Sequence, residues 1–205
     1  MENIYQNIPL KDIPWNIEDP PKQLRELLTT KKVELCKAID LGCGAGNYAI
    51  YMAKAGFDVT GIDISPTAIR LAKENAMAKD ISCRFLVADV IKEMVKNIGK
   101  FDFAYDWALL HHIYPQLRKQ YLENVNKLLS PGSKYLSVCF SIEDPQFGGA
   151  GNYRKTGIGT VLYFSTEDEM RTLFSQYFTI LELKTIILPA KHGIHKAIYV
   201  FMEKK

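Results

Sequence analysis

The sequence contains no long apolar segment and no clustered cysteines, and both absences limit what the protein can be. None of its hydrophobic runs approaches the ~20 residues needed to cross a bilayer. The start of the chain lacks the basic residues and the apolar stretch of a signal peptide. The four cysteines, at positions 36, 43, 83 and 139, show neither a CxxC pair nor a zinc-type spacing. We therefore predict a cytoplasmic protein with reduced thiols and no membrane partner.

The sequence also has no large excess of positive or negative charge. The 205 residues include 26 Lys and Arg and 23 Asp and Glu, which gives a formal net charge of +3. This near balance provides no electrostatic reason to expect nucleic acid as a partner. Hydrophobic residues make up 47% of the chain, as is usual for a globular protein. Because no repeat or low-complexity segment divides the chain, we predict a single domain over residues 1–205.

Short β-rich runs alternate with amphipathic stretches between residues 37 and 140. This alternation predicts βαβ units and a parallel sheet with helices on both faces. The expected strands are Lys37–Leu41, Asp58–Ile62, Cys83–Ala88, Phe101–Tyr105 and Tyr135–Phe140. The expected helices cover residues 47–55, 66–79, 90–97 and 115–129. Ser65 and Pro66 have the N-cap and first-turn positions of the second helix, and Ser165 with Asp168 predicts the N-cap of a further helix.

The ends of the chain and one insertion depart from the alternation. Residues 18–30 predict a leading helix within an N-terminal segment that covers residues 1–30. Residues 141–164 are rich in glycine, and a long irregular segment in a compact domain is often a lid or binding loop. The runs Phe178–Leu188 and Ala197–Met202 predict an antiparallel hairpin that is appended to the parallel sheet.

The most informative stretch is AIDLGCGAGN, which runs from Ala38 to Asn47. A buried strand there meets a glycine-rich turn and then a helix, and glycine lets the backbone approach a ligand closely. The NAD fingerprint G-x-G-x-x-G is replaced by G-x-G-x-G, with Asn47 where the last glycine is expected. Asp40, just before the loop, can hold an ammonium group but would repel a diphosphate. Both departures favour a nucleotide that carries a cationic amino acid over NAD.

Two further carboxylates follow the next two strands. Asp63 lies about 20 residues beyond the first glycine, where a carboxylate accepts hydrogen bonds from ribose hydroxyls. Ile64 follows it and can cover the face of a purine. Asp89, at the end of the third strand, can accept a hydrogen bond from the adenine amino group. Each aspartate alone can be a helix N-cap, but the joint placement of Asp40, Asp63 and Asp89 predicts one adenosyl-type site.

These residues resemble the motifs of class I S-adenosylmethionine-dependent methyltransferases. Asp40–Gly46 resembles the first motif, Val59–Ser65 and Ala88–Val90 the next two, Phe101–Asp106 the fourth, and Leu128–Gly132 the turn before the fifth strand. The resemblance implies a Rossmann-like α/β fold, with a doubly wound, mostly parallel seven-stranded sheet and an antiparallel last strand. It also implies S-adenosylmethionine as the cofactor and in-line methyl transfer to a small-molecule acceptor.

A finer resemblance concerns the N-terminal segment and the fourth strand end. Ile13-Pro14-Trp15 and the stretch from Asp106 to His112 are similar to the thiopurine, thiol and halide methyltransferases and to the tellurite-resistance type. In these relatives the N-terminal segment folds over the cofactor, which implies that Trp15 contacts it; alternatively, Trp15 seals the edge of the core. Here Glu18 and Asp19 replace the glycine that the family has after its Pro-Trp pair. The cofactor-binding residues that the resemblances and motifs predict are Trp15, Asp40, Gly42, Cys43, Gly44, Asn47, Asp63, Ile64, Asp89, Val90, Asp106 and Trp107.

The acceptor side is predicted less specifically. We expect a soft nucleophile such as a thiol or a halide. His111 and His112 follow the fourth strand, where one of them can remove a proton from an acceptor that needs it; the structural alternative is that they bond backbone groups at a helix start. Tyr153 and Arg154, in the glycine-rich insertion, are candidates for the acceptor pocket. The four histidines have no supporting carboxylate or thiol motif, so we predict no metal site.

Three other functions remain open. An NAD-dependent oxidoreductase on a similar fold is disfavoured by Asn47 and by the additional carboxylate of Asp89. A methyltransferase that acts on nucleic-acid bases usually carries an Asn/Asp-Pro-Pro-aromatic motif after the fourth strand, where this chain has Asp-Trp-Ala-Leu; a protein target remains an alternative. A binder that holds the cofactor without catalysis would show cofactor affinity without turnover.

Overall fold

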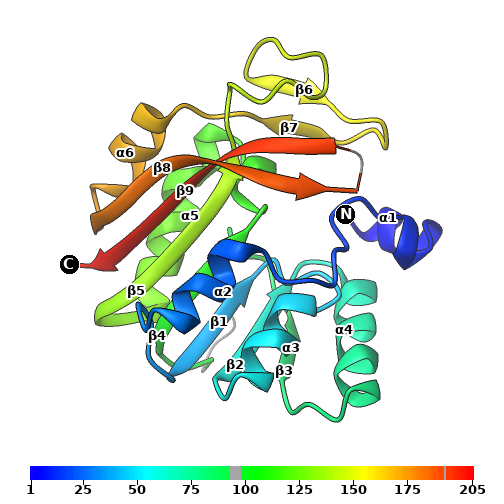
Figure 1. Ribbon diagram of the computed structural model, residues 1–205, viewed down its shortest axis with the longest axis vertical. Coiled ribbons are helices and arrows are strands. Elements are labelled where there is room, and N and C mark those ends of the chain that lie inside the picture. The colour runs from blue at the N-terminus through cyan, green and yellow to red at the C-terminus, as the bar shows by residue number, and fades with distance from the viewer. Residues whose placement is uncertain (93–97, 192) are drawn as a thin grey trace.

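The computed structural model describes residues 1–92, 98–191 and 193–205. Seven strands form one sheet in the order β3-β2-β1-β4-β5-β9-β8 (Figure 1). Neighbours from β3 to β5 are parallel, whereas β9 is antiparallel to both β5 and β8. The predicted Rossmann-like α/β sheet with a reversed last strand is therefore confirmed. The strands are β1 (Lys37–Leu41), β2 (Asp58–Asp63), β3 (Arg84–Val87), β4 (Phe101–Trp107), β5 (Leu129–Phe140), β8 (Phe178–Ala190) and β9 (Gly193–Lys204).

Helices cover both faces of this sheet, because successive side chains of its buried strands point to opposite faces. In β1, Ala38 belongs to the core on one face and Ile39 to the core on the other. The first core is completed by α2, α3 and α4, and the second by α5 and α6. The helices are α2 (Lys22–Thr29), α3 (Asn47–Lys54), α4 (Pro66–Ala78), α5 (Pro115–Leu128) and α6 (Glu167–Phe174), with the short η2 (Leu110–His112) after β4.

Several predicted boundaries differ from the observed ones. Of the predicted helix 90–97, residues 93–97 lie outside the described residues and 90–92 form a bend. The turn expected at Leu128–Gly132 lies from Leu129 onward inside β5, where the register passes from Leu129 opposite Phe101 to Lys134 opposite Phe103. The N-cap of α6 is Thr166 in a capping box with Glu169, one position later than predicted. Ser165 is not available as the cap because its buried hydroxyl accepts a hydrogen bond from Arg118.

The N-terminal segment contains α1 (Glu2–Asn7) and η1 (Leu10–Asp12), which the sequence did not predict. The predicted leading helix is shorter than 18–30, because Pro20 and Pro21 delay the start of α2. The Glu2 carboxylate accepts hydrogen bonds from the Ser65 and Thr67 hydroxyls at the start of α4. Figure 1 shows α1 beside α4, close to the ends of the parallel strands.

The glycine-rich insertion, expected to be irregular, contains a small hairpin of β6 (Tyr153–Lys155) and β7 (Val161–Tyr163). The terminal hairpin is longer than predicted, and its register extends to Ala190 opposite Gly193. None of the helices in the described part of the chain has the length and hydrophobicity that a membrane crossing requires. The four cysteines form no disulfide.

Candidate active site

The loop between β1 and α3 holds the backbone in conformations that only glycine adopts readily. Gly44 and Gly46 have φ angles of +53° and +81°. A Cβ atom on Gly46 would lie 2.9 Å from the Phe85 ring, and one on Gly44 would lie 2.6 Å from the Tyr5 hydroxyl oxygen. The glycine spacing is therefore required both by the turn and by close packing. Gly42 N and Cys43 N donate to the Ile62 carbonyl oxygen, which fixes the loop to the end of β2.

Asp63, the last residue of β2, faces this loop. One carboxylate oxygen accepts a hydrogen bond from Gly44 N at 2.9 Å, and the other accepts one from Ser65 N at 2.9 Å. Its side chain is largely buried, and burial raises the pKa of this carboxyl above its ordinary value. Because each carboxylate oxygen has two lone pairs, both oxygens retain one for a further donor. This capacity fits a pair of ribose hydroxyls.

Asp40 lies deeper, on β1 beside Tyr105 of β4. Burial raises the pKa of the Asp40 carboxyl to about 8. The Tyr105 hydroxyl is also buried and has no hydrogen-bond partner among the described residues. A buried carboxyl with this pKa holds a proton at neutral pH and ionises when a cation approaches it. The pair is chemically compatible with the ammonium end of an amino-acid-bearing nucleotide, and this role of Asp40 stays a prediction.

The third predicted carboxylate caps the bend that follows β3. Asp89 accepts hydrogen bonds from Ile91 N at 2.9 Å and Lys92 N at 3.4 Å, and its other oxygen lies 3.6 Å from Lys92 Nζ. The adjacent Val90 is half-buried, whereas the Ile64 side chain at the end of β2 is 54% exposed. Exposed apolar surface beside Asp63 fits the predicted purine contact, and the adenine role of Asp89 stays a prediction.

The side chains of two other predicted cofactor residues, Asn47 and Asp106, form hydrogen bonds within the protein. Asn47 donates to Asn16 Oδ1 at 2.8 Å, so its amide ties α3 to the N-terminal segment. Asp106 is fully buried and accepts hydrogen bonds from the hydroxyls of Tyr121, Tyr135 and Ser137, while burial raises its pKa to about 6. Both side chains therefore link elements through hydrogen bonds, and their cofactor roles stay predictions.

Cys43 lies within the glycine loop, and Trp107 ends β4. Burial raises the pKa of the Cys43 thiol well above its usual value, so this thiol stays protonated. The Trp107 ring meets the Tyr48 ring edge-on at 6.1 Å, which packs the end of β4 against α3.

The N-terminal segment covers the loop with two aromatic residues. Trp15 Nε1 donates to the Tyr5 hydroxyl at 2.9 Å, and Tyr5 lies over Gly44. The Trp15 ring also meets the His112 ring at 6.2 Å. Trp15 thus connects the glycine loop with the predicted acceptor side. Sequence reasoning missed Tyr5, because no motif marks it and its partner lies far along the chain.

The two predicted catalytic histidines differ in surroundings. His111 is buried and stacks on Phe140 with ring centroids 4.1 Å apart, and its Nδ1 accepts a hydrogen bond from Phe140 N at 3.4 Å. Burial lowers the pKa of His111 well below its usual value and that of His112 to about 4. Both imidazoles are therefore neutral and weakly basic at pH 7.

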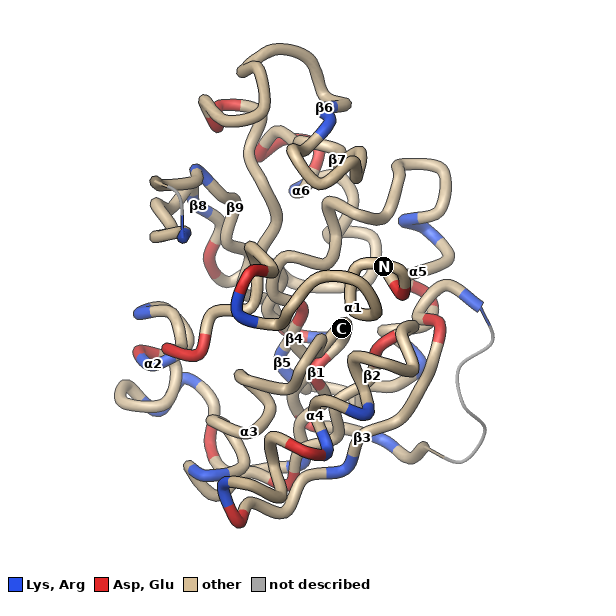
Figure 2. Tube along the Cα trace, turned by 90° about the vertical axis from the view of Figure 1, so that its right-hand side faces the viewer, with Lys and Arg blue, Asp and Glu red and all other residues tan. Residues whose placement is uncertain are grey.

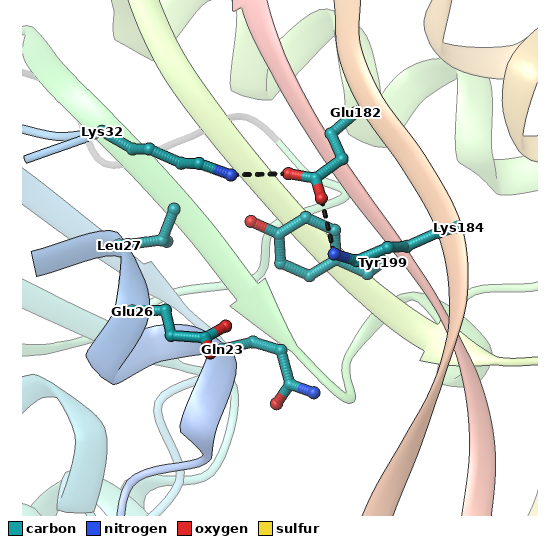
Figure 3. Close-up of a pocket in the computed structure, with 7 residues that line it drawn as sticks. All are labelled: Gln23, Glu26, Leu27, Lys32, Glu182, Lys184 and Tyr199. Carbon is teal, nitrogen blue, oxygen red and sulfur yellow. Dashed lines mark hydrogen bonds and ion pairs between the residues drawn. The ribbon is translucent and has the colours of Figure 1, made fainter. Parts of the chain in front are cut away.

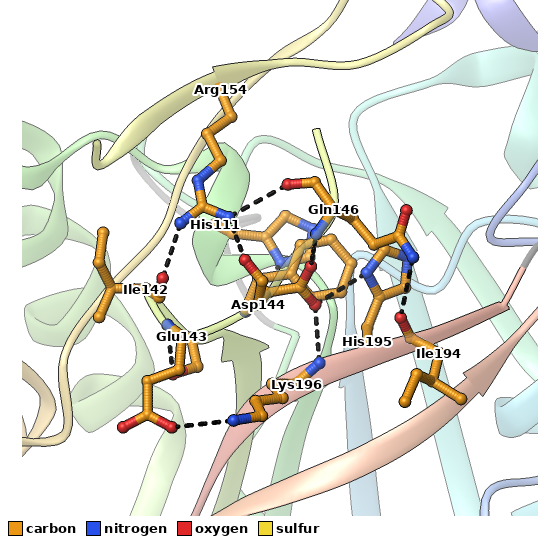
Figure 4. A network of polar contacts seen from close by, with 11 residues as sticks. His111, Ile142, Glu143, Asp144, Gln146, Arg154, Ile194, His195 and Lys196 are labelled. Carbon is orange, nitrogen blue, oxygen red and sulfur yellow. Dashed lines mark hydrogen bonds and ion pairs between the residues drawn. The ribbon is translucent and has the colours of Figure 1, made fainter. Parts of the chain in front are cut away.

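The insertion carries the two predicted acceptor residues. Tyr153 is 54% exposed and meets the rings of Tyr114 and Tyr163 edge-on. Arg154 is buried, and its guanidinium donates to the carbonyl oxygens of Ile142, Asp144 and Gln146 (Figure 4). It also donates to the Gly151 carbonyl oxygen. Arg154 therefore holds the segment after β5 in place, and its predicted acceptor contact stays a prediction. Within this segment Asp144 faces His195, a pairing that the sequence gave no signal for.

A small hollow elsewhere, between α2 and the terminal hairpin, is lined by Gln23, Leu27, Tyr199 and four charged side chains (Figure 3). Glu182 lies 2.8 Å from Lys32 Nζ and 2.5 Å from Lys184 Nζ. This hollow lies on the face of the sheet, beside the middle of β9. No group of three or more potential metal-ligating side chains occurs among the residues that the structure covers.

The family model and the relatives that match this chain are methyltransferases, which agrees with the geometry of the site. A family model described as "Methyltransferase domain" matches residues 38–132. The chain is 29% identical over 170 residues to a 2-heptyl-1-hydroxyquinolin-4(1H)-one methyltransferase of Mycobacteroides abscessus, covering 82% of this chain and 69% of that protein. It is 27% identical over 137 residues to probable thiol methyltransferase 2 of Arabidopsis thaliana, covering 66% of this chain and 60% of that protein.

A solved structure has the same fold over nearly the whole chain. It is the 1,6-didemethyltoxoflavin-N1-methyltransferase of Burkholderia thailandensis, crystallised with its substrate and S-adenosylhomocysteine. It is 22% identical, has a TM-score of 0.75, and the match covers 99% of this chain and 84% of that chain. The family match over residues 38–132, the relatives and the sheet order support the identification of this chain as a class I S-adenosylmethionine-dependent methyltransferase.

Proposed function

We propose that this enzyme methylates a small molecule that enters beside the ends of β4 and β5, under the glycine-rich insertion. One observation supports this proposal most: two chemically different surfaces meet at the same edge of the sheet. The glycine loop and the buried carboxylates of Asp40 and Asp63 lie on one side, and a series of aromatic rings and neutral histidines lies on the other. The first surface suits a cationic nucleotide, and the second suits an uncharged or aromatic acceptor.

In this proposal the protein acts mainly by binding and alignment. Bound S-adenosylmethionine supplies a methyl group on an electrophilic sulfonium. Asp63 uses its two remaining lone pairs for the ribose hydroxyls, and Asp40 ionises to hold the ammonium group. The ring of Trp15 covers the loop from the N-terminal side. Holding two reactants in line can contribute ~7–11 kcal/mol, so positioning alone accounts for much of the rate.

The acceptor class is supported by charge and by the relatives. Acidic and basic positions are interspersed over the side of the molecule that Figure 2 shows, as the net charge of +3 suggests. Such a surface lacks the basic excess that nucleic-acid substrates favour. The mycobacterial relative is named for a hydroxyquinolone and the plant relative for thiols. A soft nucleophile such as a thiol or halide therefore remains the starting proposal for the acceptor.

Calorimetry followed by an acceptor panel tests this function. We expect S-adenosylhomocysteine to bind and NAD not to bind. We also expect methyl transfer to at least one thiol, aromatic hydroxyl, amine or halide, detected by mass spectrometry. Cofactor binding without any turnover across the panel would indicate a macromolecular acceptor or a non-catalytic binder. NAD binding would overturn the assignment of the site.

A further inference from the structure

A histidine outside the predicted site has a buried carboxylate as its partner. His195, near the start of β9, has its Nδ1 3.0 Å from Asp144 Oδ2 (Figure 4). The Asp144 side chain is fully buried, and its two oxygens also accept hydrogen bonds from Gln146 N and Lys196 N, both at 2.7 Å. Backbone groups thus fix the carboxylate, and the carboxylate fixes the imidazole.

This pairing determines where the neutral imidazole carries its proton. An ionised carboxylate only accepts hydrogen bonds, so Nδ1 of His195 is the donor and Nε2 keeps the lone pair. None of the described residues forms a hydrogen bond with Nε2, and 15% of the side chain is exposed. A positioned imidazole whose lone pair is not used by the described residues, with a carboxylate behind it, is the arrangement that general-base catalysis uses.

The position of His195 connects it to the acceptor side. Phe140, the last residue of β5, stacks on His111 at 4.1 Å and on His195 at 4.4 Å. Phe147 adds a further stacked ring 5.6 Å from His195. The rings continue through His112 to Trp15 above the glycine loop. An acceptor beside Phe140 would therefore lie between the cofactor loop and His195.

The other described histidines are poor proton acceptors. Nδ1 of His111 is occupied by the Phe140 amide, and burial lowers the pKa of this imidazole well below its usual value. Burial also lowers the pKa of His112 to about 4, so a proton taken from an acceptor would be held weakly there. Of the histidines in the described ranges, His195 is the one with a carboxylate partner.

We infer that His195, oriented by Asp144, removes the proton of the acceptor, and that the acceptor is a thiol or an aromatic hydroxyl and not a halide. This inference rests on the proposed function and narrows its acceptor class. The acceptor loses its O–H or S–H proton to Nε2 of His195. The electron pair left on the acceptor forms the new bond to the methyl carbon, while the pair of the broken S–C bond stays on the cofactor sulfur. The imidazolium, stabilised by Asp144, then releases the proton to water.

The kinetic test uses His195→Gln, which keeps a polar side chain but removes the base. The matched control is Ile194→Gln, because Ile194 is the exposed neighbour of His195 in β9. With phenol as the acceptor we expect kcat of His195→Gln to fall by roughly 10²–10⁴-fold. With thiophenol, which is more acidic, we expect a smaller loss. Ile194→Gln should keep the wild-type rate with both acceptors. An equal loss with phenol and thiophenol in His195→Gln, or no loss with phenol, would overturn the inference.

Two further measurements distinguish a catalytic from a structural role of His195. They are the pH profile of kcat/KM and the position of the imidazole proton, and neither would change if His195 only stabilised the fold. The pH dependence of kcat/KM for phenol should differ between the wild type and His195→Gln, because the variant lacks the base. The titratable and charged groups around His195 that contribute to this profile are Asp144, His111, Arg154, and Lys196 with its partner Glu143.

Nitrogen-15 NMR of the imidazoles decides the tautomer without any turnover. We expect the proton of neutral His195 on Nδ1 in the wild type, with a shift toward Nε2 in Asp144→Asn. A wild-type proton on Nε2 would overturn the inference even if methyl transfer is observed. Loss of S-adenosylhomocysteine binding in the wild type would instead overturn the proposed function, whatever the tautomer. Calorimetry should also give equal S-adenosylhomocysteine affinity for the wild type and His195→Gln.

Discussion

At the ends of β1, β2 and β3 the chain presents backbone amides and carboxylates, whereas at the ends of β4 and β5 it presents rings and imidazoles. The first region is built from consecutive βα units, with Gly44 and Asp63 joined by a direct hydrogen bond. The second is assembled from η2, β5, the insertion and β9, and its groups meet around Phe140. The two regions lie on the same edge of one sheet.

The difference suits the two unlike reactants of the proposed function. Carboxylates attract the cationic ends of a nucleotide, and a positive-φ glycine loop brings the backbone close to it. Aromatic faces and neutral histidines instead favour an uncharged or weakly acidic partner, because burial disfavours charge there. Changes in the first region should therefore affect cofactor affinity, and changes in the second should affect turnover.

The largest expected effect is a difference in stability between the alanine variants of two glycines that have similar φ angles. Gly46 has φ +81° and Gly132 in β5 has φ +76°, but a Cβ atom meets Phe85 and Ala72 only at Gly46. Gly46→Ala should lower the free energy of unfolding by about 2–4 kcal/mol through clash and backbone strain. Gly132→Ala should cost about 1 kcal/mol through strain alone. Urea denaturation measures both, and equal losses would mean that packing around Gly46 is not tight.

Asp63→Ala is the next test, and it probes the cofactor region by itself. The loss of charge-assisted hydrogen bonds should weaken S-adenosylhomocysteine binding by roughly 1–3 kcal/mol. Calorimetry measures the change, with Ile194→Gln as a control that leaves affinity as in the wild type. Unchanged affinity in Asp63→Ala would contradict its assignment to the ribose.

The buried Asp40 carboxyl should couple cofactor binding to pH. Its folded-state pKa of about 8 lies above the ordinary value, so the folded protein holds the proton more tightly than the unfolded chain does. Its contribution to stability is therefore full below the ordinary pKa near 4 and is lost as pH rises through about 8. Binding of a cationic ligand should ionise Asp40 and release up to about one proton at pH 7.

Calorimetry in buffers of different ionisation enthalpy measures this release, and affinity should rise by up to about tenfold per pH unit below pH 8. Asp40→Asn should abolish the release and flatten the pH dependence of stability in urea titrations. Proton release that persists in Asp40→Asn would assign it to another group.

The smallest expected effect concerns the N-terminal segment. Trp15→Ala removes the hydrogen bond to the Tyr5 hydroxyl and the ring contact with His112. We expect S-adenosylhomocysteine affinity to fall by about 1 kcal/mol. Tyr5→Phe removes only the hydroxyl and should cost about 0.5 kcal/mol. If Trp15→Ala lowers thermal stability but leaves affinity intact, Trp15 only seals the core edge.

The cofactor region was predictable because its groups are close in sequence and follow strand ends that hydrophobic patterning reveals. Asp40 and Asp63 lie where their strands end, and the Ser65 cap with Pro66 begins α4 as expected. Asn47 and Asp106 lie within the same motifs, yet their side chains bond to other parts of the protein. The sequence pattern places a residue on an element, but it does not determine which neighbour its side chain reaches.

The acceptor region could not be predicted in the same way. His195 and Asp144 are separated by 51 positions, and their meeting depends on the register of β9 against β5. Tyr5 reaches the glycine loop only because α1 packs on α4 through Glu2. Neither contact leaves a periodic pattern or a fixed spacing in the sequence. Arg154, which sequence reasoning assigned to the acceptor, instead binds carbonyl oxygens of its own segment.

A crystal structure of the complex with S-adenosylhomocysteine tests most directly whether the cofactor and the acceptor occupy separate parts of this sheet edge. We predict that both ribose hydroxyls lie within hydrogen-bond distance of the Asp63 carboxylate and that the cofactor sulfur faces the side of Phe140. A ligand whose ribose lies away from Asp63, or whose sulfur points away from the rings around Phe140, would contradict the account.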